Sequence, residues 1–401
     1  MQRFLQNSQW ILVAIAAIAS GCQMRSTLEP DRPQREHSEC VENYDPDLDY
    51  FRERTQPQYA TGFSVEYHKN YKIVTVRNPW QETDTTFQYL LVQCGTPKPE
   101  GSAEMQAFEI PVQSVVTLST THLPHLDRLG IIDRLIGVSR FNTVNTASVR
   151  AKIEQGELLE TSSGRTLNIE ALLERSPDVL LTYGTGNPEF DRHEQLIAAG
   201  IPVAMVAEYM ESSPLGRAEW IKFTALFFNR EAEANEIFSE IAREYESLLE
   251  LTRQVEDLPT VFAGFSYEGT WYVAGANSYV GQFLEDAGAD YIWSDLTIAG
   301  SSPKDFEAVF DRAKDADYWL NASQDWKHRD DAIAADIRYG KFAALQSDRV
   351  FNPTARLSPE GGNDYWETGM LEPHLILADL IAILHPELLP DRQLKYYRQL
   401  D

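Results

Sequence analysis

Short apolar segments alternate with amphipathic helical segments in two long stretches of the chain, and this alternation restricts the fold more than any other feature of the sequence. The helical segments of the first stretch end at Gly130 and Gly200. Strands that alternate with helices form parallel sheets covered by those helices. The predicted strands are SVVTL, RLIGVS, DVLLTYG and IPVAMV in the first stretch, and TVFAGFS, TWYVAG, ADYWLNA and RVFN in the second.

A helical stretch separates the two α/β stretches. Apolar residues recur at helical spacing between Pro214 and about Val255, and we expect Asn229 to divide this stretch into two helices. The second helix would have about 25 residues and a length of roughly 37 Å. A helix of that length suits a strut between two lobes.

The sequence therefore predicts an α/β protein with two Rossmann-like lobes joined by a long connector helix. A chain of 401 residues is long enough for two lobes and an extension. Period-two and β-branched patterns predict a small β-rich extension, packed against the first lobe. The predicted parts are the extension at 41–107, the N-terminal lobe at 108–213, the connector helices at 214–257 and the C-terminal lobe at 258–401.

The first 21 residues have the pattern of a signal peptide. The apolar run from Trp10 to Ala19 is about ten residues, well short of the ~20 needed to span a bilayer. The small residues before Cys22 resemble a bacterial lipobox, with Cys22 as the lipidated first residue, although leucine is usual where Ala19 stands. An unlipidated secreted chain and an uncleaved anchor are the alternatives. Residues 22–40 are polar and contain proline, which predicts a flexible tether.

Two further cysteines and the net charge give information about the compartment and the partners. Cys40 and Cys94 form an even pair, which predicts a disulfide in an oxidising compartment, with two separate buried thiols as the alternative. The formal net charge is −26, from 35 basic and 61 acidic residues. So acidic a surface repels phosphate backbones, and we do not expect nucleic acid as a partner.

A predicted helix followed by a predicted strand occurs twice in the chain with similar sequences. The segment NIEALLERSPDVLL begins at Asn168, and DFEAVFDRAKDADYWL begins at Asp305. When the two are aligned, Glu170 matches Glu307 in the first turn of each predicted helix. The helix dipole favours a carboxylate in the first turn of a helix. One explanation of the two glutamates is therefore that they are surface residues that only complement the dipole.

The ordered set of these segments resembles the periplasmic substrate-binding proteins of ABC importers, in the class whose lobes are joined by one rigid helix. Known members of that class carry iron–siderophore complexes, cobalamin or haem. The similarity extends over about residues 113–390 and leaves the extension outside the usual pattern. It is carried by the connector helix and by VVTLSTTHLPHLDRLGIIDRLIGVS, LNIEALLERSPDVLLTYGTGN and GSSPKDFEAVFDRAKDADYWL.

The resemblance implies a function and two partners. It implies a monomeric, lipid-anchored, extracytoplasmic binding protein that is no enzyme, needs no cofactor and delivers its ligand to an ABC permease in the inner membrane. A ferric siderophore is the first expected ligand, and cobalamin or another tetrapyrrole is the second. In this family a glutamate on each lobe docks with permease arginines, and Glu170 and Glu307 occupy the matching positions; a carboxylate can bind arginine in a bidentate manner.

In such folds the ligand lies between the lobes, at loops that follow the strands. Aromatic side chains there could stack on a chelate, and an arginine could bind its acidic groups. Some of these aromatic residues are expected to be core instead, and Tyr272 and Trp319 lie within strands and are expected to pack. The candidate ligand residues are Thr121, His122, Tyr183, Thr185 and Tyr209 in the first lobe, and Tyr267, Trp271, Trp293, Trp326 and Arg356 in the second.

Two competing motifs are weak, and the common catalytic motifs are absent. His122 and His125 could begin a metal site, but no third ligand is evident nearby, and we predict no metal site. The segment YGTGNP lacks the third glycine of a dinucleotide fingerprint. No G-x-S-x-G, H-E-x-x-H or P-loop is present, so a hydrolase with a dispersed site and a scaffold lipoprotein without a ligand remain the alternatives.

Overall fold

The computed structural model describes residues 40–102, 104–163 and 166–401. The predicted signal peptide, the lipidation site Cys22 and all of the predicted tether before Cys40 lie outside the described residues. No helix within the described residues has the length and apolar character needed to cross a membrane.

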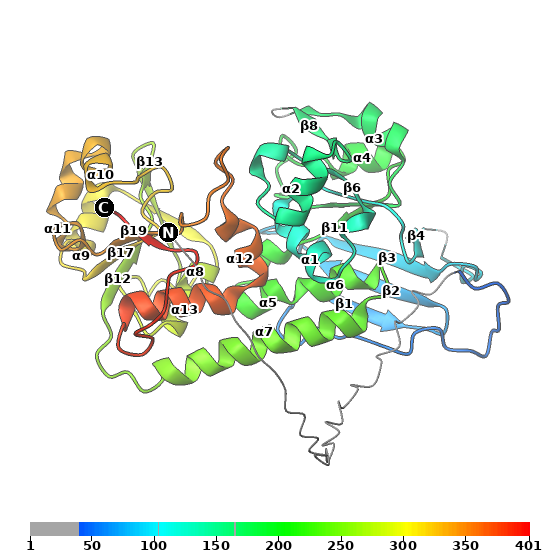
Figure 1. Cartoon of the computed structure of the whole chain (residues 1–401), viewed down its shortest axis with the longest axis horizontal. Helices are drawn as coiled ribbons and strands as arrows, with labels where there is room; N and C mark the ends of the chain where they lie inside the picture. The colour runs from blue at the N-terminus through cyan, green and yellow to red at the C-terminus, as the bar shows by residue number, and fades with distance from the viewer. Residues whose placement is uncertain (1–39, 103, 164–165) are drawn as a thin grey trace, which may run out of the picture. The chain divides into compact units, whose positions relative to one another are not determined.

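The N-terminal extension is a four-stranded sheet with the order β1-β2-β3-β4 (Figure 1). The first three strands are antiparallel and β4 runs parallel to β3, so the sheet continues to Ile110, past the predicted boundary at 107. Buried and more exposed residues alternate at the start of β1 and at the end of β4, whereas the last five residues of β3 are all buried. The strands are β1 (Phe63–Tyr67), β2 (Tyr71–Arg77), β3 (Thr86–Gln93) and β4 (Gln106–Ile110).

The buried face of this sheet packs mainly against the connector helices. The ring of Phe63 lies 4.9 Å from that of Trp220, and the ring of Phe108 lies 5.2 Å from that of Phe227. The expected contact with the first lobe is also present, because the Met205 N–H donates to Tyr89 Oη at 2.8 Å. The extension therefore contacts both the connector and the first lobe.

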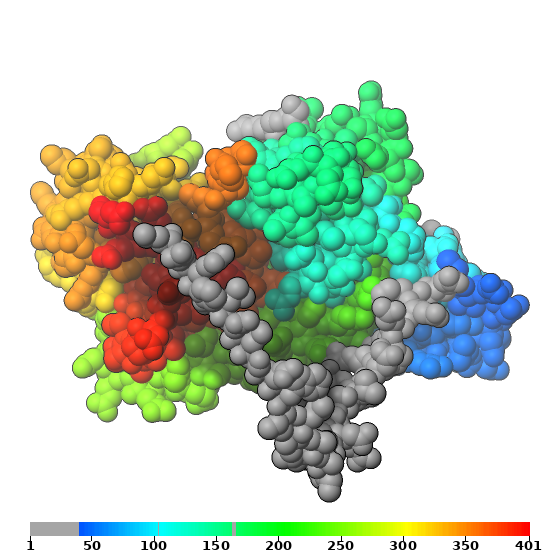
Figure 2. All heavy atoms as spheres, viewed as in Figure 1, coloured from blue at the N-terminus to red at the C-terminus, as the bar shows by residue number. Residues whose placement is uncertain are grey.

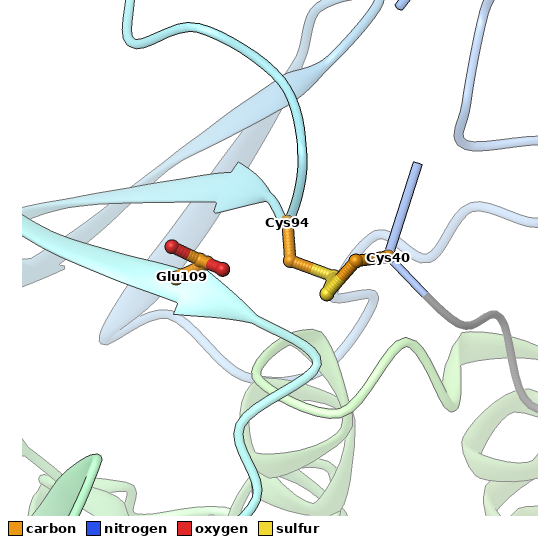
Figure 3. Close-up of side chains that lie close together, drawn as sticks. All are labelled: Cys40, Cys94 and Glu109. Atoms are coloured by element: carbon orange, nitrogen blue, oxygen red, sulfur yellow. A yellow bond between two sulfur atoms is a disulfide. The ribbon is translucent and has the colours of Figure 1, made fainter. Parts of the chain in front are cut away.

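A disulfide fixes the start of the described chain to this sheet. Cys40 and Cys94 are bonded, with their Cα atoms 4.8 Å apart (Figure 3). Cys94 directly follows β3, and the Val41 N–H also donates to the Cys94 carbonyl at 2.9 Å. The bond thus joins the residue at the end of the predicted tether to an inner strand of the extension.

The first lobe contains a parallel sheet with the order β11-β10-β5-β6-β7 (Figure 1). The order of the strands reverses between β5 and β10, and this is where α/β sheets open a crevice at their carboxyl ends. The strands are β5 (Val115–Thr117), β6 (Leu135–Val138), β7 (Leu159–Glu160), β10 (Val179–Thr182) and β11 (Val203–Met205). The helices are α1 (Leu123–Arg128), α2 (Ala147–Glu154), α3 (Ile169–Arg175) and α4 (His193–Ala198), and β8 (Ser162–Ser163) pairs with β9 (Thr166–Leu167).

Three helices form the connector, α5 (Pro214–Ala218), α6 (Trp220–Leu226) and α7 (Glu231–Thr252). Asn229 has a φ of 52° between α6 and α7, so the chain turns there as predicted. Helix α7 has 22 residues, slightly fewer than expected, and it buries Phe238, Ile241 and Tyr245 at helical spacing.

The second lobe has a five-stranded sheet with the order β15-β12-β17-β18-β19, in which the last strand is antiparallel. Its strands are β12 (Thr260–Ala263), β15 (Asp290–Tyr291), β17 (Tyr318–Leu320), β18 (Val350–Asn352) and β19 (Arg398–Gln399). No strand was predicted over β15 or β19, and the segment RVFN was expected to be the last strand. The predicted strand TWYVAG belongs to a separate antiparallel sheet of β13 (Ser266–Tyr267), β14 (Thr270–Ala274) and β16 (Ser301–Lys304).

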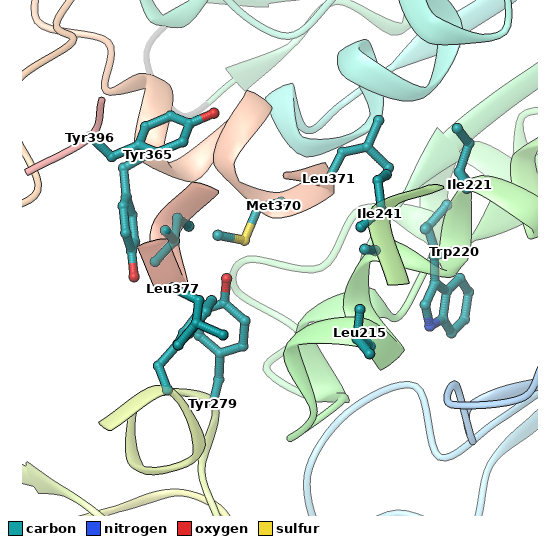
Figure 4. Close-up of a cluster of buried hydrophobic side chains, with 14 of the residues drawn as sticks. Leu215, Trp220, Ile221, Ile241, Tyr279, Tyr365, Met370, Leu371, Leu377 and Tyr396 are labelled. Carbon is teal, nitrogen blue, oxygen red and sulfur yellow. The ribbon is translucent and has the colours of Figure 1, made fainter. Parts of the chain in front are cut away.

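The helices of the second lobe share one hydrophobic core with the connector (Figure 4). Leu215 of α5 and Ile241 of α7 belong to the same buried cluster as Met370 and Leu377. Helix α13 also packs along α7. The helices are α8 (Tyr279–Asp286), α9 (Phe306–Ala313), α10 (Arg329–Ala335), α11 (Ala343–Gln346), α12 (Thr368–Leu371) and α13 (Pro373–Leu384).

A buried carboxylate joins the extension to helix α6. Glu219 is fully buried and accepts the backbone N–H groups of Gln58, Tyr59 and Ala60 at 2.7–2.9 Å. Its other oxygen accepts from Lys222 Nζ at 2.6 Å. Because a buried carboxylate is stable only with several donors, these bonds specify where the segment before β1 lies.

The histidines of the HLPH motif are both core residues. His122 and His125 are buried, and burial lowers the pKa of each imidazole to about 3. His125 Nδ1 lies 3.0 Å from Thr224 Oγ1. Among the described residues, the group of three potential metal ligands that lie close together is Cys40, Cys94 and Glu109, whose two sulfurs are already joined in the disulfide, and it does not include this pair. The two histidines are therefore neutral packing residues.

Replacing Glu219 by alanine should lower the free energy of unfolding by about 3–5 kcal/mol, because three backbone donors and the Lys222 ammonium lose their buried acceptor. Urea unfolding followed by circular dichroism measures this. Glu240 is exposed on α7, and Glu240→Ala should change stability by less than about 0.5 kcal/mol. Equal stabilities for the two variants would contradict the role of Glu219.

The buried histidines should make the protein less stable in acid. An unfolded histidine takes up a proton as the pH falls through about 6.5, whereas folded His125, with its lowered pKa, does not. Each such histidine therefore costs about 1.4 kcal/mol of stability per pH unit below that value. In His125→Gln the fall in stability between pH 6 and pH 5 should be smaller by about this amount, measured by urea unfolding at each pH. An unchanged slope would mean that His125 is charged in the folded protein.

Candidate ligand-binding site

A cavity opens at the carboxyl ends of the first lobe's strands. It has a volume of about 370 Å³ and is lined by Leu118, Ser139 and Tyr183, which follow β5, β6 and β10 respectively. This is the place where the strand order reverses, and ligands of open α/β sheets bind there. The cavity is within the usual size range of ligand pockets, ~300–1,000 Å³.

The lining combines positive charge, aromatic surface and hydroxyl groups. Arg140 and Arg192 supply guanidinium groups. Tyr183 and Phe190 supply aromatic rings, and these two residues are 44% and 56% exposed. Such a set can bind acidic groups of a ligand and stack against its flat or apolar face. The remaining lining residues are Ser162, Leu167, Thr182 and Glu189.

Sequence reasoning missed Arg140, Phe190 and Arg192. The signal for Arg140 was present, because it directly follows the predicted strand RLIGVS, which is the place where the other candidates were sought. The signal for Phe190 and Arg192 was weaker, because they stand at the far end of the loop after β10. That loop folds back to the cavity, and the sequence does not show that it does so.

Two predicted ligand residues shape this loop instead of lining the cavity. The Asp191 carboxylate accepts the N–H and the hydroxyl of Thr185 at 2.6 and 2.8 Å, and the N–H of Gly186 at 2.9 Å. Tyr209 Oη donates to the Gly184 carbonyl at 2.6 Å, and burial raises the pKa of this phenol to about 12. Of the ten predicted residues, Tyr183 is the one that lines this cavity.

Thr121 and His122 lie on the amino-terminal side of α1 and contact a buried carboxylate. Thr121 Oγ1 donates to Glu208 Oε1 at 2.6 Å. Burial raises the pKa of the Glu208 carboxyl group. His122, also a predicted ligand residue, does not line this cavity: its side chain is completely buried and its Nε2 lies 3.8 Å from the same Glu208 oxygen.

In the second lobe the predicted tryptophans are largely core residues. Trp271 is fully buried, and its Nε1 donates to the Ala263 carbonyl at 3.1 Å, so this predicted ligand residue packs in the core of the second lobe. Trp293 and Trp326 are only 6% and 8% exposed. These three tryptophans are buried because each indole packs against neighbouring groups of the protein. For Trp293 one such group is the guanidinium of Arg312, whose Cζ lies 4.5 Å from the ring centre.

Exposed aromatic groups in the second lobe stand close to the end of β12. Tyr267, one of the predicted ligand residues, is 60% exposed, and Phe265, which was not predicted, is 36% exposed. Both follow β12, which lies beside β17 where the order of the second sheet reverses. This edge is the counterpart of the cavity edge in the first lobe.

Arg356 belongs to a segment that reaches across to the first lobe. Its Nε lies 2.5 Å from Asp364 Oδ2, so the predicted ligand arginine already has an anionic partner. Ser358 Oγ donates to the Asn142 carbonyl at 3.3 Å, two residues beyond Arg140. Figure 2 shows this segment, in orange and brown, against the blue-green surface of the first lobe.

The two aligned glutamates occupy equivalent, exposed places. Glu170 lies in the first turn of α3, which the Asn168 side chain caps by accepting the Ala171 N–H at 3.0 Å. Glu307 lies in the first turn of α9, which Asp305 caps in the same way. The two sites differ in one contact, because Arg338 Nη1 lies 3.1 Å from Glu307 Oε1.

Similar proteins give the fold and the family. The chain is 28% identical over 373 residues to an uncharacterized lipoprotein of Methanocaldococcus jannaschii, covering 85% of this chain and 84% of that protein. It is 26% identical over 215 residues to a cobalamin-binding protein of Halobacterium salinarum, covering 53% of this chain and 54% of that protein.

A solved structure of a possible iron-binding, periplasmic solute-binding protein from Staphylococcus epidermidis matches with a TM-score of 0.54 and 19% identity, covering 69% of this chain and 99% of that one. This likeness supports the fold, two α/β lobes with a helical connector. The family model described as periplasmic binding protein matches residues 115–357, from the first strand of the first lobe to the segment after β18. That match spans more than half of the chain, and the chain therefore belongs to the periplasmic binding protein family, a family of binding proteins and not of enzymes.

Proposed function

We propose that this chain is a lipid-anchored binding protein of an ABC importer that captures a metal chelate, with a ferric siderophore as the first candidate, and delivers it to the permease. The observation that carries the proposal is the first-lobe cavity, in which Arg140 and Arg192 stand beside the exposed rings of Tyr183 and Phe190. The lipid would be attached at Cys22, which agrees with the lipoprotein among its relatives.

Charge favours an anionic ligand at this place. The whole chain has a formal net charge of −26, so most of its surface repels anions. Two arginines and one glutamate, Glu189, line this cavity, so its charged groups sum to a positive local charge. A guanidinium binds carboxylate or phosphate oxygens in a bidentate manner. A chelate with acidic groups at its edge and an apolar face would use both kinds of side chain in the cavity.

The cavity would hold part of the ligand, and the second lobe would supply the rest of the contacts. Phe265 and Tyr267 are exposed after β12 and are the aromatic groups proposed for that side. Tyr183 is proposed as a contact from the first lobe, whereas Thr185 and Tyr209 would act through the shape of the loop. No chemical step is involved, and the ligand would be released unchanged.

A tetrapyrrole is the second candidate. One relative is a cobalamin-binding protein, and exposed aromatic rings can stack on a corrin or haem plane. The aromatic pair Tyr183 and Phe190 suits this class of ligand as well as the first, and the arginines could bind propionate or phosphate groups.

The ligand prediction is tested with ferric hydroxamate and ferric catecholate siderophores, cyanocobalamin and haemin. We expect one of these classes to bind one-to-one in isothermal titration calorimetry. Arg140→Gln should weaken that binding by about tenfold or more, because it removes a charge-assisted contact. Arg243→Gln, on the exposed face of α7, is the control and should leave the affinity unchanged. No binding of any probe would contradict the proposed ligand class.

The docking prediction concerns Glu170 and Glu307. A Glu170→Arg, Glu307→Arg double variant should lose uptake of the bound ligand in cells that carry the importer, while its affinity for the ligand stays the same, because arginine repels the permease arginines. The matched control is Glu174→Arg with Asp311→Arg, which reverses two exposed charges one helical turn further along the same helices. Normal uptake in the first variant, or equal loss in both, would contradict docking through these glutamates.

A further inference from the structure

A tryptophan of the N-terminal extension lies against the back of the loop that lines the ligand cavity. Trp80 comes from the turn between β2 and β3, and the loop follows β10. A Cβ atom added to Gly184 would lie 2.7 Å from Trp80 Cε3, and one added to Gly186 would lie 2.7 Å from Trp80 Cδ1. The indole therefore rests on the bare backbone of both glycines.

This contact accounts for the glycines of YGTGNP, which match no nucleotide-binding motif. Gly186 also needs its small size for a φ of +76°, whereas Gly184 has no such backbone requirement and is required to be small by its neighbours, Trp80 and the end of the Met205 side chain. The glycines make the loop intrinsically flexible, so contacts are needed to fix its conformation, in addition to the hydrogen bonds that Asp191 accepts within the loop.

Two aromatic rings pack against Trp80. Its ring centre lies 5.5 Å from that of His193, at the start of α4, and 6.2 Å from that of Phe87 in β3. At the same place the Tyr209 hydroxyl lies 2.6 Å from the Gly184 carbonyl and 3.2 Å from the Pro79 carbonyl. The extension and the loop are thus joined by ring packing and through one shared hydroxyl.

One loop separates Trp80 from the ligand cavity. Tyr183, Phe190 and Arg192 of this loop line the cavity of about 370 Å³. Gly186 and Pro188 of the same loop line, with Trp80, a second cavity of about 260 Å³. A movement of the indole would therefore shift the side chains that face the ligand.

We propose that Trp80 is a positioning residue of the binding site, and that the extension serves to hold the loop of residues 183–192 in its binding conformation. This inference rests on the proposed function, because that function places the ligand against this loop. The physical reason is the entropy that is lost when a flexible segment becomes ordered. If the loop became ordered only when the ligand binds, this loss would lower the affinity; a loop that is already ordered avoids it. An extension outside the usual family pattern would then contribute to affinity without touching the ligand.

Hydrogen exchange of the full chain tests the contact without any ligand. In Trp80→Ala the amides of residues 183–192 should exchange about tenfold faster than in the wild type, and Trp80→Phe should restore most of the protection. The control is Tyr71→Ala, which removes a ring of the same sheet that stacks on His68 instead. Unchanged exchange of this loop in Trp80→Ala would overturn the proposal.

A double-variant cycle tests whether the indole and the glycine act through each other. Gly184→Ala should speed exchange of the loop in the wild type, because its new Cβ meets the indole. In the Trp80→Ala background the same change should add little, because the other close atom is Met205 Cε at 3.0 Å, the end of a flexible side chain. Independent, additive effects would overturn the contact as the cause.

Calorimetric titration with the ferric siderophores, cyanocobalamin and haemin completes the test. For the probe that binds the wild type, Trp80→Ala should raise Kd by about tenfold, and Trp80→Phe should bring it back close to the wild-type value. A loosened loop with an unchanged Kd would overturn the positioning role. If the wild type binds none of the probes, the proposed ligand class fails, and the exchange experiments still decide whether Trp80 holds the loop.

Discussion

Buried carboxylates that accept backbone N–H groups from distant parts of the chain determine how the parts of this protein are joined. Glu219 holds residues 58–60, Glu367 holds the start of α2 through Thr146, and Asp379 holds residues near the end of the chain. Each carboxylate stands on or next to a helix of the connector or of the second lobe. A buried charge requires its donors in place, so these contacts tolerate less variation than apolar packing does.

The candidate site depends on this arrangement at two levels. The parallel sheet of the first lobe opens a crevice where its strand order reverses, and the cavity lies there. The lining is then completed by a loop whose shape comes from Asp191 and Tyr209 on one side and from Trp80 on the other. The general location is thus a property of the fold, and the detailed surface depends on an extension that the rest of the family pattern does not include.

Much of the fold could be predicted from the sequence, because hydrophobic period and glycine or asparagine at helix ends are local signals. Asn229 ended α6 as predicted. The strand β19 could not be predicted, because a two-residue strand has no period and forms only against β18. The site was predicted less well. Along β14, Trp271 is buried and Tyr272 is 53% exposed, which is the reverse of the expectation. The two-residue period of a strand already implied that these neighbours face opposite sides.

The disulfide has a mechanical consequence under the proposed anchoring of the chain at Cys22. A pull on the tether reaches the folded body at Cys40 and passes through the covalent bond to Cys94, at the end of β3. Strand β3 has hydrogen-bonded neighbours on both sides, β2 and β4. The load is therefore borne along an inner strand, where many hydrogen bonds would have to break together, and it enters through the extension before it reaches either lobe.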